Sequence, residues 1–499
     1  YKERKAKNQF GAEISDGSYG LTKGRWVYFN DQTDYIKLLY KNHTFSQTHN
    51  LSVSGADDKF DYYLSGRYFK DTGLFNSDTN GDSYSMYNAR LKTGYQPEKW
   101  IRFSNNIDMS RTRYRYPVTY SEGNGNVWRN LADEGHPSSP IWNPDGTMTY
   151  SAVYSIGDLL YGNSHRTYIN DYVKNTFSVS TNFLDNRLHV NGDFTYRNQN
   201  YNCTTKRVRT EYSKTAGTEE TISGTQSYLS ENPVNTIYMS TNEYAEYENT
   251  FFKKHYFKAL LGYNYEQSQS KGLYAYNDDL LTEDVNNINL ALGTDNRNIT
   301  GSWSKWRGIG IFYRINYIFD EKYLLELNGR YDGSSKFPDG QRWGFFPSIS
   351  GGWRVTSEPW FKVSPEYVSN IKLRASYGSL GNSNVDPYSY GETFSVSQGR
   401  IINGAKVLYT SAPSPIPSGL TWERASMLDL GADLGFFNNR LNITGDWYNR
   451  ITSNMYTVGP TLPDVYGASS PKGNYATMST KGYEISVTWN SSFRLADKP

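Results

Sequence analysis

The stretch Asn316–Phe337, NYIFDEKYLLELNGRYDGSSKF, decides the fold because it reads as two half-apolar strands around a tight turn. After the turn, one face carries Tyr323, Leu325, Leu327, Gly329 and Tyr331, and the other carries Glu326, Asn328, Arg330 and Asp332. Before the turn, the residues from Gly308 to Phe319 alternate in the same way. Alternation with a period of two is typical of a β-strand with two different faces, so the stretch predicts a hairpin.

The same alternation recurs along the chain, for example in Phe60–Tyr68, Leu188–Tyr196 and Leu428–Phe436. We count about fifteen such segments, most of them roughly ten to fifteen residues long, whereas globular strands average nearer five or six. Tyrosine (45 residues) and glycine (43 residues) are abundant, and this mixture favours strands over helices. The sequence therefore predicts an all-β protein with long antiparallel strands.

The connections between these segments alternate between two kinds. Short ones are GADDK, QPEK, LDNR, FKKH, FDEK and FNN. Long polar ones cover roughly 70–83, 114–171, 201–240, 268–302, 382–423 and 453–476. Outer-membrane barrels place tight turns at the periplasmic rim and long loops outside, whereas a sandwich mixes loop lengths at both ends. One connection, Thr356–Asn370, stands where a tight turn is due, and we expect a short periplasmic helix there.

Composition is compatible with a barrel whose strands face lipid on one side and a wet lumen on the other. Apolar residues make up 37% of the chain and the mean hydropathy is −0.73, and no apolar run approaches the length of a spanning helix. Low overall hydropathy with one apolar face per strand is what a transmembrane barrel requires. Tyrosines near strand ends fit an aromatic girdle: Tyr68, Tyr196, Tyr265, Tyr331 and Tyr377. The alternative is a soluble or surface β-sandwich that binds carbohydrate or acts as an adhesin.

Charge and reactive residues argue against several other functions. The 52 basic and 50 acidic residues nearly balance, so nucleic-acid binding is not expected. The single cysteine, Cys203, cannot form an internal disulfide, and the six histidines show no metal-binding spacing. Asp278 and Asp279, and the stretch Asn143–Thr147, could touch a cation but more often form turns. We therefore expect no enzyme, metal or cofactor, although an outer-membrane enzyme with a site assembled in space stays open.

Ligand contacts are expected in the long loops. The stretch VWRNLADEGHPSSPIWNPDG places Trp128 and Trp142 beside Asn130, Asp133 and Asn143. Aromatic faces together with amide and carboxylate groups suit the mixed apolar and hydroxyl surface of a sugar. These five residues are the candidate substrate-binding residues, and packing of the loop against the barrel mouth is the alternative explanation for them.

Several stretches resemble the barrel of the SusC/RagA-like family of TonB-dependent outer-membrane transporters. They are THNLSVSGADDKFDYYLSGRYFKDTGLF, NYIFDEKYLLELNGRYDGSSKFPDGQRWGFFPSISGGWRV, NIKLRASYGSLGNSN, LTWERASMLDLGADLGFFNNRLNITGDWYNRITSNMY and STKGYEISVTWN. The resemblance implies a 22-stranded barrel, an N-terminal plug, energy from the TonB complex and a SusD-like lipoprotein lid. It also implies import of oligosaccharides or peptides across the outer membrane of a Gram-negative bacterium.

From this resemblance we expect residues 1–45 to be a lead-in segment, either the end of the plug-to-barrel region or a first strand and loop. Residues 46–499 are expected to be a barrel segment of about fifteen of the 22 strands, truncated at its C-terminus. The plug and the TonB contact are expected to lie outside the chain.

Overall fold

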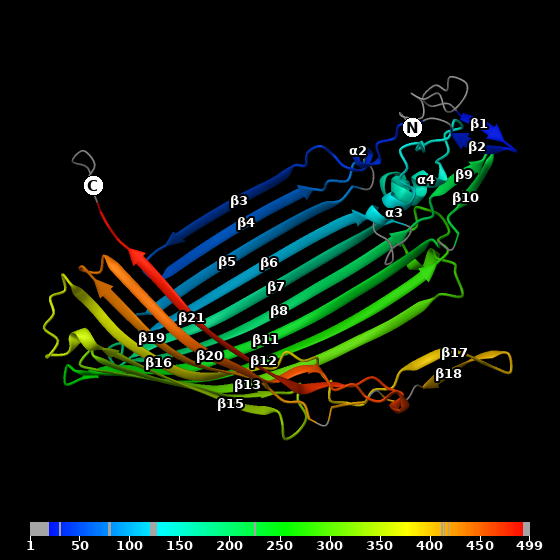
Figure 1. The fold of residues 1–499 in the computed structure, drawn as a ribbon. Helices are drawn as coiled ribbons and strands as arrows, with labels where there is room; N and C mark the ends of the chain where they lie inside the picture. Colours follow the sequence, from blue (N-terminus) through cyan, green and yellow to red (C-terminus); the bar gives the residue numbers. More distant parts are fainter. Residues whose placement is uncertain are drawn as a thin grey trace, which may run out of the picture.

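Antiparallel β-structure dominates the computed structural model, which describes residues 19–28, 31–77, 81–119, 127–223, 226–410, 413, 415–417 and 419–492. Fifteen strands form one sheet in which each strand pairs with its neighbours along the chain, as Figure 1 shows. The predicted all-β antiparallel architecture is therefore confirmed. The sheet begins at Ser46, where the expected lead-in segment ends, and the first eighteen residues of that segment lie outside the described residues. The division of the chain at residue 46 stays a prediction.

The strands of the large sheet are β3 (Ser46–Ala56), β4 (Phe60–Thr72), β5 (Ser83–Glu98), β6 (Ile101–Pro117), β7 (His165–Phe183), β8 (Leu188–Arg207), β11 (Tyr228–Phe251), β12 (His255–Asp278), β13 (Asn298–Phe319), β14 (Tyr323–Ser334), β15 (Trp343–Arg354), β16 (Val368–Asn382), β19 (Glu423–Phe436), β20 (Leu441–Val458) and β21 (Lys472–Trp489). Two small sheets stand apart, one of β1 (Tyr19–Thr22), β2 (Arg25–Tyr28), β9 (Glu211–Thr215) and β10 (Thr218–Thr221), the other of β17 (Val396–Ile402) and β18 (Ala405–Thr410).

Helices are short and lie in the connections: α2 (Tyr35–Leu39), α3 (Val127–Glu134), α4 (Tyr150–Ala152), the π-helical turn η1 (Val153–Gly157), α5 (Asp158–Tyr161), and the 3₁₀ turns η2 (Ile288–Leu290), η3 (Val355–Ser357) and η4 (Asp464–Tyr466). In the described part of the chain, no helix has the length and apolar character that crossing a membrane would require. A short helix is expected within Thr356–Asn370, but the structure has only the three-residue 3₁₀ turn η3 at the start of this stretch, followed by turns and irregular backbone up to β16.

The hairpin predicted at Asn316–Phe337 is β13 and β14, with the predicted pairing of faces. Ile315 lies opposite Leu327, and Tyr313 lies opposite Gly329. The ring of Tyr313 covers this glycine so closely that a Cβ there would stand 2.5 Å from a ring atom. Asp320 and Glu321 adopt positive φ in the turn, which reverses the chain within three residues.

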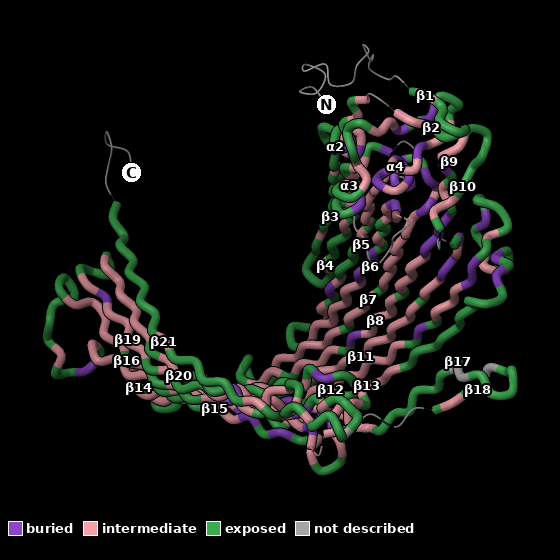
Figure 2. The backbone as a smooth tube through the Cα atoms, turned by 45° about the vertical axis from the view of Figure 1, so that its right-hand side comes forward, coloured by how far each residue is buried: buried purple, intermediate pink, exposed green. Residues whose placement is uncertain are grey.

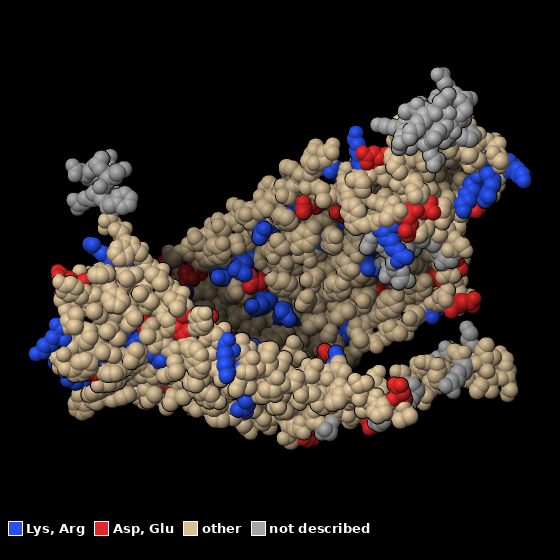
Figure 3. Space-filling model, viewed as in Figure 1, with Lys and Arg blue, Asp and Glu red and all other residues tan. Residues whose placement is uncertain are grey.

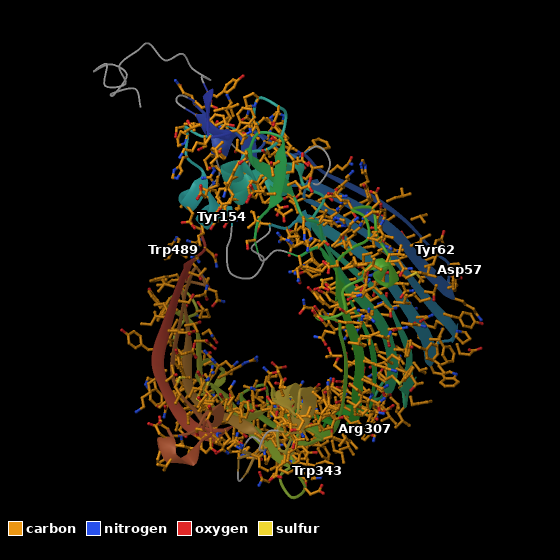
Figure 4. The ribbon with its side chains drawn as sticks, turned by 90° about the vertical axis from the view of Figure 1, so that its right-hand side faces the viewer. Asp57, Tyr62, Tyr154, Arg307, Trp343 and Trp489 are labelled. Carbon is orange, nitrogen blue, oxygen red and sulfur yellow. The ribbon has the colours of Figure 1, made fainter. Side chains whose placement is uncertain are left out.

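The large sheet curls around a hollow without closing, as Figures 2 and 4 show. Its two edges are β3 and β21, which among the described strands pair only with β4 and β20 respectively. The prediction of a partial barrel of about fifteen strands is confirmed in strand number.

Several strands are longer than the predicted ten to fifteen residues. β11 and β12 have 24 residues each, a length of about 80 Å at roughly 3.3 Å per residue. About ten tilted residues suffice to cross a bilayer, so these strands are long enough to continue well beyond it. On the outer face of β12, apolar Leu261 and Tyr263 give way to Gln267, Gln269 and Lys271. Because both faces are polar in this upper part, the sequence pattern there was misread as loop.

Short and long connections lie at opposite rims of the sheet, as predicted. The short ones cover 57–59, 99–100, 184–187, 252–254, 320–322 and 437–440. The long ones cover 73–82, 118–164, 208–227, 279–297, 383–422 and 459–471, and they gather at the end drawn toward the right of Figure 1. The β14–β15 connection, 335–342, also lies at this end and was not recognised in the sequence because it is only eight residues long.

The outer, convex face carries an apolar belt between two aromatic rows. Leu261 on β12 is 63% exposed and Ile485 on β21 is 71% exposed, and similar side chains recur on the strands between them, a contiguous apolar surface that water-soluble monomers rarely show. Toward the long-loop end, the rings of Tyr331 and Trp343 stack 4.9 Å apart. At the short-turn rim, the ring of Tyr323 stacks 6.2 Å from that of Phe319.

Tyr331 stands eight residues after Tyr323, the first residue of its strand, and Tyr68 stands eight residues after Phe60 in β4. Eight residues of a strand tilted by about 45° rise roughly 19 Å. The aromatic rings at both ends add to this height, so the height of the belt approaches the ~25 Å of the apolar band in outer-membrane barrels.

The inner, concave face is polar and holds ion pairs. Arg374 on β16 binds Asp433 at 3.0 Å and Asp446 at 2.9 Å, and Lys258 on β12 binds Glu246 at 2.7 Å. Figure 3 shows charged side chains gathered in the hollow of the sheet. An apolar exterior around a polar interior is the reverse of a soluble sandwich, and it is the arrangement of a transmembrane barrel.

Replacing Leu327 with arginine tests the outer belt. Leu327 lies between Ile315 and Ile349 in a cross-strand row, midway between Tyr323 and Tyr331. We expect Leu327→Arg to lower the unfolding free energy of the complete receptor by about 2 to 4 kcal/mol, the cost of a charge on the lipid face. Asn328→Arg, on the inner face, is the control and should have a small effect. Urea titration in lipid vesicles measures both, and equal effects would contradict the assignment of faces.

Protease sites inserted into two connections test the sidedness. A site at Asn289, in a long connection, should be cut in intact cells, whereas a site at Asp185, in a short turn, should be cut only after permeabilisation. Cleavage of both sites in intact cells would contradict the topology.

Candidate extracellular binding site

The long connections fold into two packed clusters at the mouth of the sheet. The first loop cluster has a buried core of Tyr35, Leu39, Ile141, Ala152, Ile156, Leu159 and Leu160. Figure 4 shows this cluster, marked by the label of Tyr154, at the edge of the opening that the sheet surrounds. The second loop cluster buries Phe337, Val385 and Leu420, and the indole of Trp422 donates to the carbonyl of Arg342 at 2.9 Å. The mouth is therefore built of ordered loops on both walls.

A helical segment formed by α4, η1 and α5 organises the first loop cluster. It begins because the Thr149 hydroxyl accepts a hydrogen bond from the backbone of Ala152 at 3.1 Å. It then buries Ala152, Ile156, Leu159 and Leu160 on one stripe, a spacing typical of an amphipathic helix.

A buried ion pair fastens this segment to the sheet. Nη2 of Arg207, the last residue of β8, lies 3.3 Å from Oδ2 of Asp158, and the two side chains are 4% and 2% exposed. The Thr210 hydroxyl donates to the other Asp158 oxygen at 2.6 Å. Removing one member of a buried pair leaves an uncompensated charge, so this contact should hold the cluster in place.

Three of the five predicted binding residues face solvent. Trp142 is 46% exposed, with its ring 5.0 Å from that of Tyr161, and Trp128 on α3 is 56% exposed. Asp133, also on α3, is partly exposed and lies 3.8 Å from Arg129. These side chains can reach a ligand, and their role in binding stays a prediction.

The other two predicted residues, Asn130 and Asn143, are buried. The amide nitrogen of Asn143 donates to the Thr147 hydroxyl at 2.9 Å and to the Ser213 carbonyl at 3.0 Å, and its oxygen accepts from the hydroxyl of Tyr28. Asn143 therefore ties three segments together. Asn143 also lines the cavity described next, and the role of Asn130 and Asn143 in binding stays a prediction.

Beside Asn143 lies a cavity of about 380 Å³ that sequence reasoning missed. Its lining includes Trp26, Tyr28, Tyr150 and Lys214. The Lys214 ammonium stands 4.0 Å from the centre of the Tyr150 ring, and the Trp26 indole nitrogen is buried with no hydrogen-bond partner among the described residues. Burial, followed by the nearby carboxylate of Asp145, raises the pKa of Tyr28 to about 12, so its hydroxyl remains a donor. Aromatic faces, a cation and hydroxyl donors suit a polar ring-shaped ligand.

No local signal could have revealed this cavity, because its walls come from β2, the 139–151 loop and β9. The strand β2 is only four residues long, too short for its alternation to be recognised.

The possible cation ligands act as turn and pairing residues. Asp145 accepts hydrogen bonds from the Thr147 hydroxyl at 2.7 Å and from its backbone at 3.1 Å, which lower the pKa of Asp145. Asp279 pairs with Arg209 at 3.2 Å, and Asp278 accepts from Asn296 at 2.7 Å. Within the described ranges, no group of three or more His, Cys, Asp or Glu side chains could hold a metal ion.

Comparison with known proteins places this geometry in a family. The family described as "TonB dependent receptor-like, beta-barrel" matches residues 142–497. The chain belongs to this family. It is 26% identical over 484 residues to TonB-dependent receptor P3 of Formosa agariphila, covering 93% of this chain and 46% of that protein. It is 23% identical over 513 residues to TonB-dependent receptor SusC of Bacteroides thetaiotaomicron, covering 93% of this chain and 47% of that protein.

The chain spans about half the length of these curated relatives. Among solved structures, the RagAB peptide importer in the closed-closed state superposes with a TM-score of 0.76 at 21% identity, over 96% of this chain and 51% of that one. The siderophore receptor PirA of Acinetobacter baumannii gives a TM-score of 0.51 at 14% identity, over 90% of this chain and 58% of that one. The fold is therefore that of a TonB-dependent receptor barrel, and the predicted SusC/RagA-like type is confirmed.

Replacing Asp158 with asparagine in the complete receptor tests the anchor of the first loop cluster. With the carboxylate removed, the buried Arg207 loses its ion pair with Asp158, and breaking a buried ion pair costs about 3 to 5 kcal/mol. We expect backbone amides of Tyr150–Tyr161 to exchange with solvent faster by roughly two to four orders of magnitude, while strand amides are unaffected. Asp133→Asn removes a partly exposed pair and should change exchange little. Equal exchange in the two variants would contradict the anchoring role.

Proposed function

We propose that the chain is the barrel segment of an outer-membrane TonB-dependent importer of oligosaccharides, with peptides as the second candidate cargo. The observation that carries this proposal is the curved sheet with an apolar belt outside and a polar, ion-paired face inside, because a wet lumen is what a hydrophilic cargo needs. Membership of the TonB-dependent receptor family supports it. A soluble β-sandwich or adhesin is disfavoured, since large apolar side chains lie on the convex face instead of in a core.

Two partners belong to this proposal. A SusD-like lipoprotein would cover the end where the long connections gather, and the TonB complex would supply the energy for import. RagAB, to which the fold is similar, is described as a peptide importer, and SusC is named as a TonB-dependent receptor. Oligosaccharides are preferred here because Trp128 and Trp142 expose flat aromatic faces at the mouth.

The lid would meet the hairpin of β17 and β18. Figure 1 shows it projecting from the long-loop end, and Ile401 and Leu408 are about 70% exposed on it. Exposed apolar side chains of this kind mark contact surfaces.

Uptake by cells that express the complete receptor and its lid tests the proposal. A mixture of fluorescent oligosaccharides and a mixture of fluorescent peptides should be compared, with and without functional TonB. We expect TonB-dependent accumulation of oligosaccharides. Accumulation of peptides alone would select the second cargo, and accumulation of neither would contradict the proposal.

Trp142→Ala tests the contribution of the loop to capture. Losing an exposed aromatic anchor should weaken binding of the imported oligosaccharide by roughly 1 to 3 kcal/mol in calorimetry on the purified receptor. Uptake should fall at low ligand concentration and recover at high concentration. Trp360→Ala is the matched control, because Trp360 is also exposed but lies in the connection between β15 and β16 at the opposite rim. Equal affinity of both variants would assign Trp142 to loop packing.

A further inference from the structure

One row of side chains crosses the inner face of four neighbouring strands. Arg90 on β5 lies opposite Asp108 on β6, Asp108 lies opposite Lys174 on β7, and Lys174 lies opposite Arg197 on β8. These side chains point into the hollow, because Val173, next to Lys174, and Phe194, three residues before Arg197, alternate with them and belong to the exposed apolar face. Figure 3 shows basic side chains gathered there. The row thus holds three cations and one carboxylate.

The single carboxylate is already occupied. Asp108 forms an ion pair with Arg90 and also accepts a hydrogen bond from Asn106 at 3.2 Å. Lys174 and Arg197 have no carboxylate partner among the described residues. Nε of Arg197 is buried without a hydrogen-bond partner there, and its guanidinium stands 5.3 Å from the centre of the Tyr238 ring.

Elsewhere on the inner face, some cations are neutralised by carboxylates of neighbouring strands. Arg374 is held by two aspartates, and Lys258 is held by Glu246 and by Glu248, the latter at 3.4 Å. Unpaired like charges repel one another, and a cleft of one sign concentrates ligands of the opposite sign. With three cations and one carboxylate side by side, the row carries excess positive charge, which makes this wall a candidate surface for binding anions.

A ladder of tyrosines runs from this row toward the mouth. Tyr201 lies four residues beyond Arg197 on the same face of β8, a rise of about 13 Å. Its ring is 6.0 Å from that of Tyr168, which in turn stacks 6.3 Å from Tyr114 and 6.1 Å from Tyr116. Between the row of charged side chains and the tyrosine ladder, Tyr172 lies opposite Gln199, and the two residues add a hydroxyl and an amide group to the inner face.

We propose that the inner wall of β5–β8 is a binding track for an acidic oligosaccharide. Sugar rings stack on Tyr168 and Tyr201, and carboxylate or sulfate groups bind Lys174 and Arg197. This assignment rests on the proposed import function and narrows its substrate class. Flat, closely spaced rings favour a chain of sugar rings over an extended acidic peptide, whose side chains offer no faces to stack.

The complete receptor with its lid is tested by calorimetry against four probes: oligogalacturonate, a sulfated galactan oligosaccharide, methyl-esterified neutral oligogalacturonate and an oligoglutamate peptide. We expect one or both acidic oligosaccharides to bind at least tenfold more tightly than the neutral one, with affinity falling as salt rises. The double variant Lys174→Gln, Arg197→Gln should lose at least tenfold in affinity for the acidic probe. Arg197→Lys, which keeps the charge, should retain most of it.

Arg314→Gln is the matched control, because it removes a cation from the inner face of β13, where Arg314 donates to Asn328 at 2.8 Å. It should change affinity less than twofold. Heat-modifiable gel migration establishes that each variant is folded.

Three outcomes would overturn the assignment. Unchanged acidic-probe affinity in a folded double variant, accompanied by loosening of the plug, would show that the cations hold the plug. Charge-dependent binding of oligoglutamate alone would replace the sugar with a peptide. Preference for the neutral oligosaccharide would overturn the acidic class while leaving oligosaccharide import standing, whereas absence of uptake of any oligosaccharide would count against the proposed function itself.

Discussion

Every backbone N–H and C=O in the bilayer must find a partner within the protein, because lipid offers none. Lateral pairing of antiparallel strands meets this requirement, and it commits successive side chains to opposite faces. The apolar outer face and the polar inner face of β13 and β14 both follow from that commitment. A shift of one residue in register would exchange the faces, so Leu327 would enter the lumen and Asn328 would meet lipid. The ion pairs of the lumen therefore depend on the same register as the apolar belt.

The loop clusters solve a different problem, since they lie in water and must be held at the mouth by a few specific contacts. Arg207 and Asp158 join the end of β8 to a helical segment, and Asn143 joins three loop segments through one amide group. Such contacts leave Trp128 and Trp142 exposed on an ordered support. In the proposed function, capture at the mouth and passage along the lumen would be carried by different parts of the chain.

Local alternation made the strands, their faces and the order of short and long connections predictable from the sequence. Strand ends were underestimated because residues such as Gln267, Gln269 and Lys271 extend a strand above the membrane without any apolar signal. The partners of Asn143 could not be predicted, since Tyr28 and Ser213 lie 115 and 70 residues away along the chain. Exposed Trp128 and Trp142 were recognised by residue type alone, whereas Lys174 and Arg197 were overlooked because their lack of counter-ions exists only in the assembled sheet.

The alternation of lipid-facing and lumen-facing residues along one strand is the central claim, and it can be measured residue by residue. With Cys203 replaced by serine, single cysteines at positions 311 to 319 of β13 would carry a spin label in the complete receptor reconstituted in lipid vesicles. Collision rates with oxygen and with a water-soluble nickel chelate would then be compared at each position. The structure predicts high oxygen accessibility at odd positions, from Ile311 to Phe319, and high nickel accessibility at even positions such as Arg314 and Asn316. Equal accessibility at odd and even positions, or alternation in the opposite phase, would contradict it.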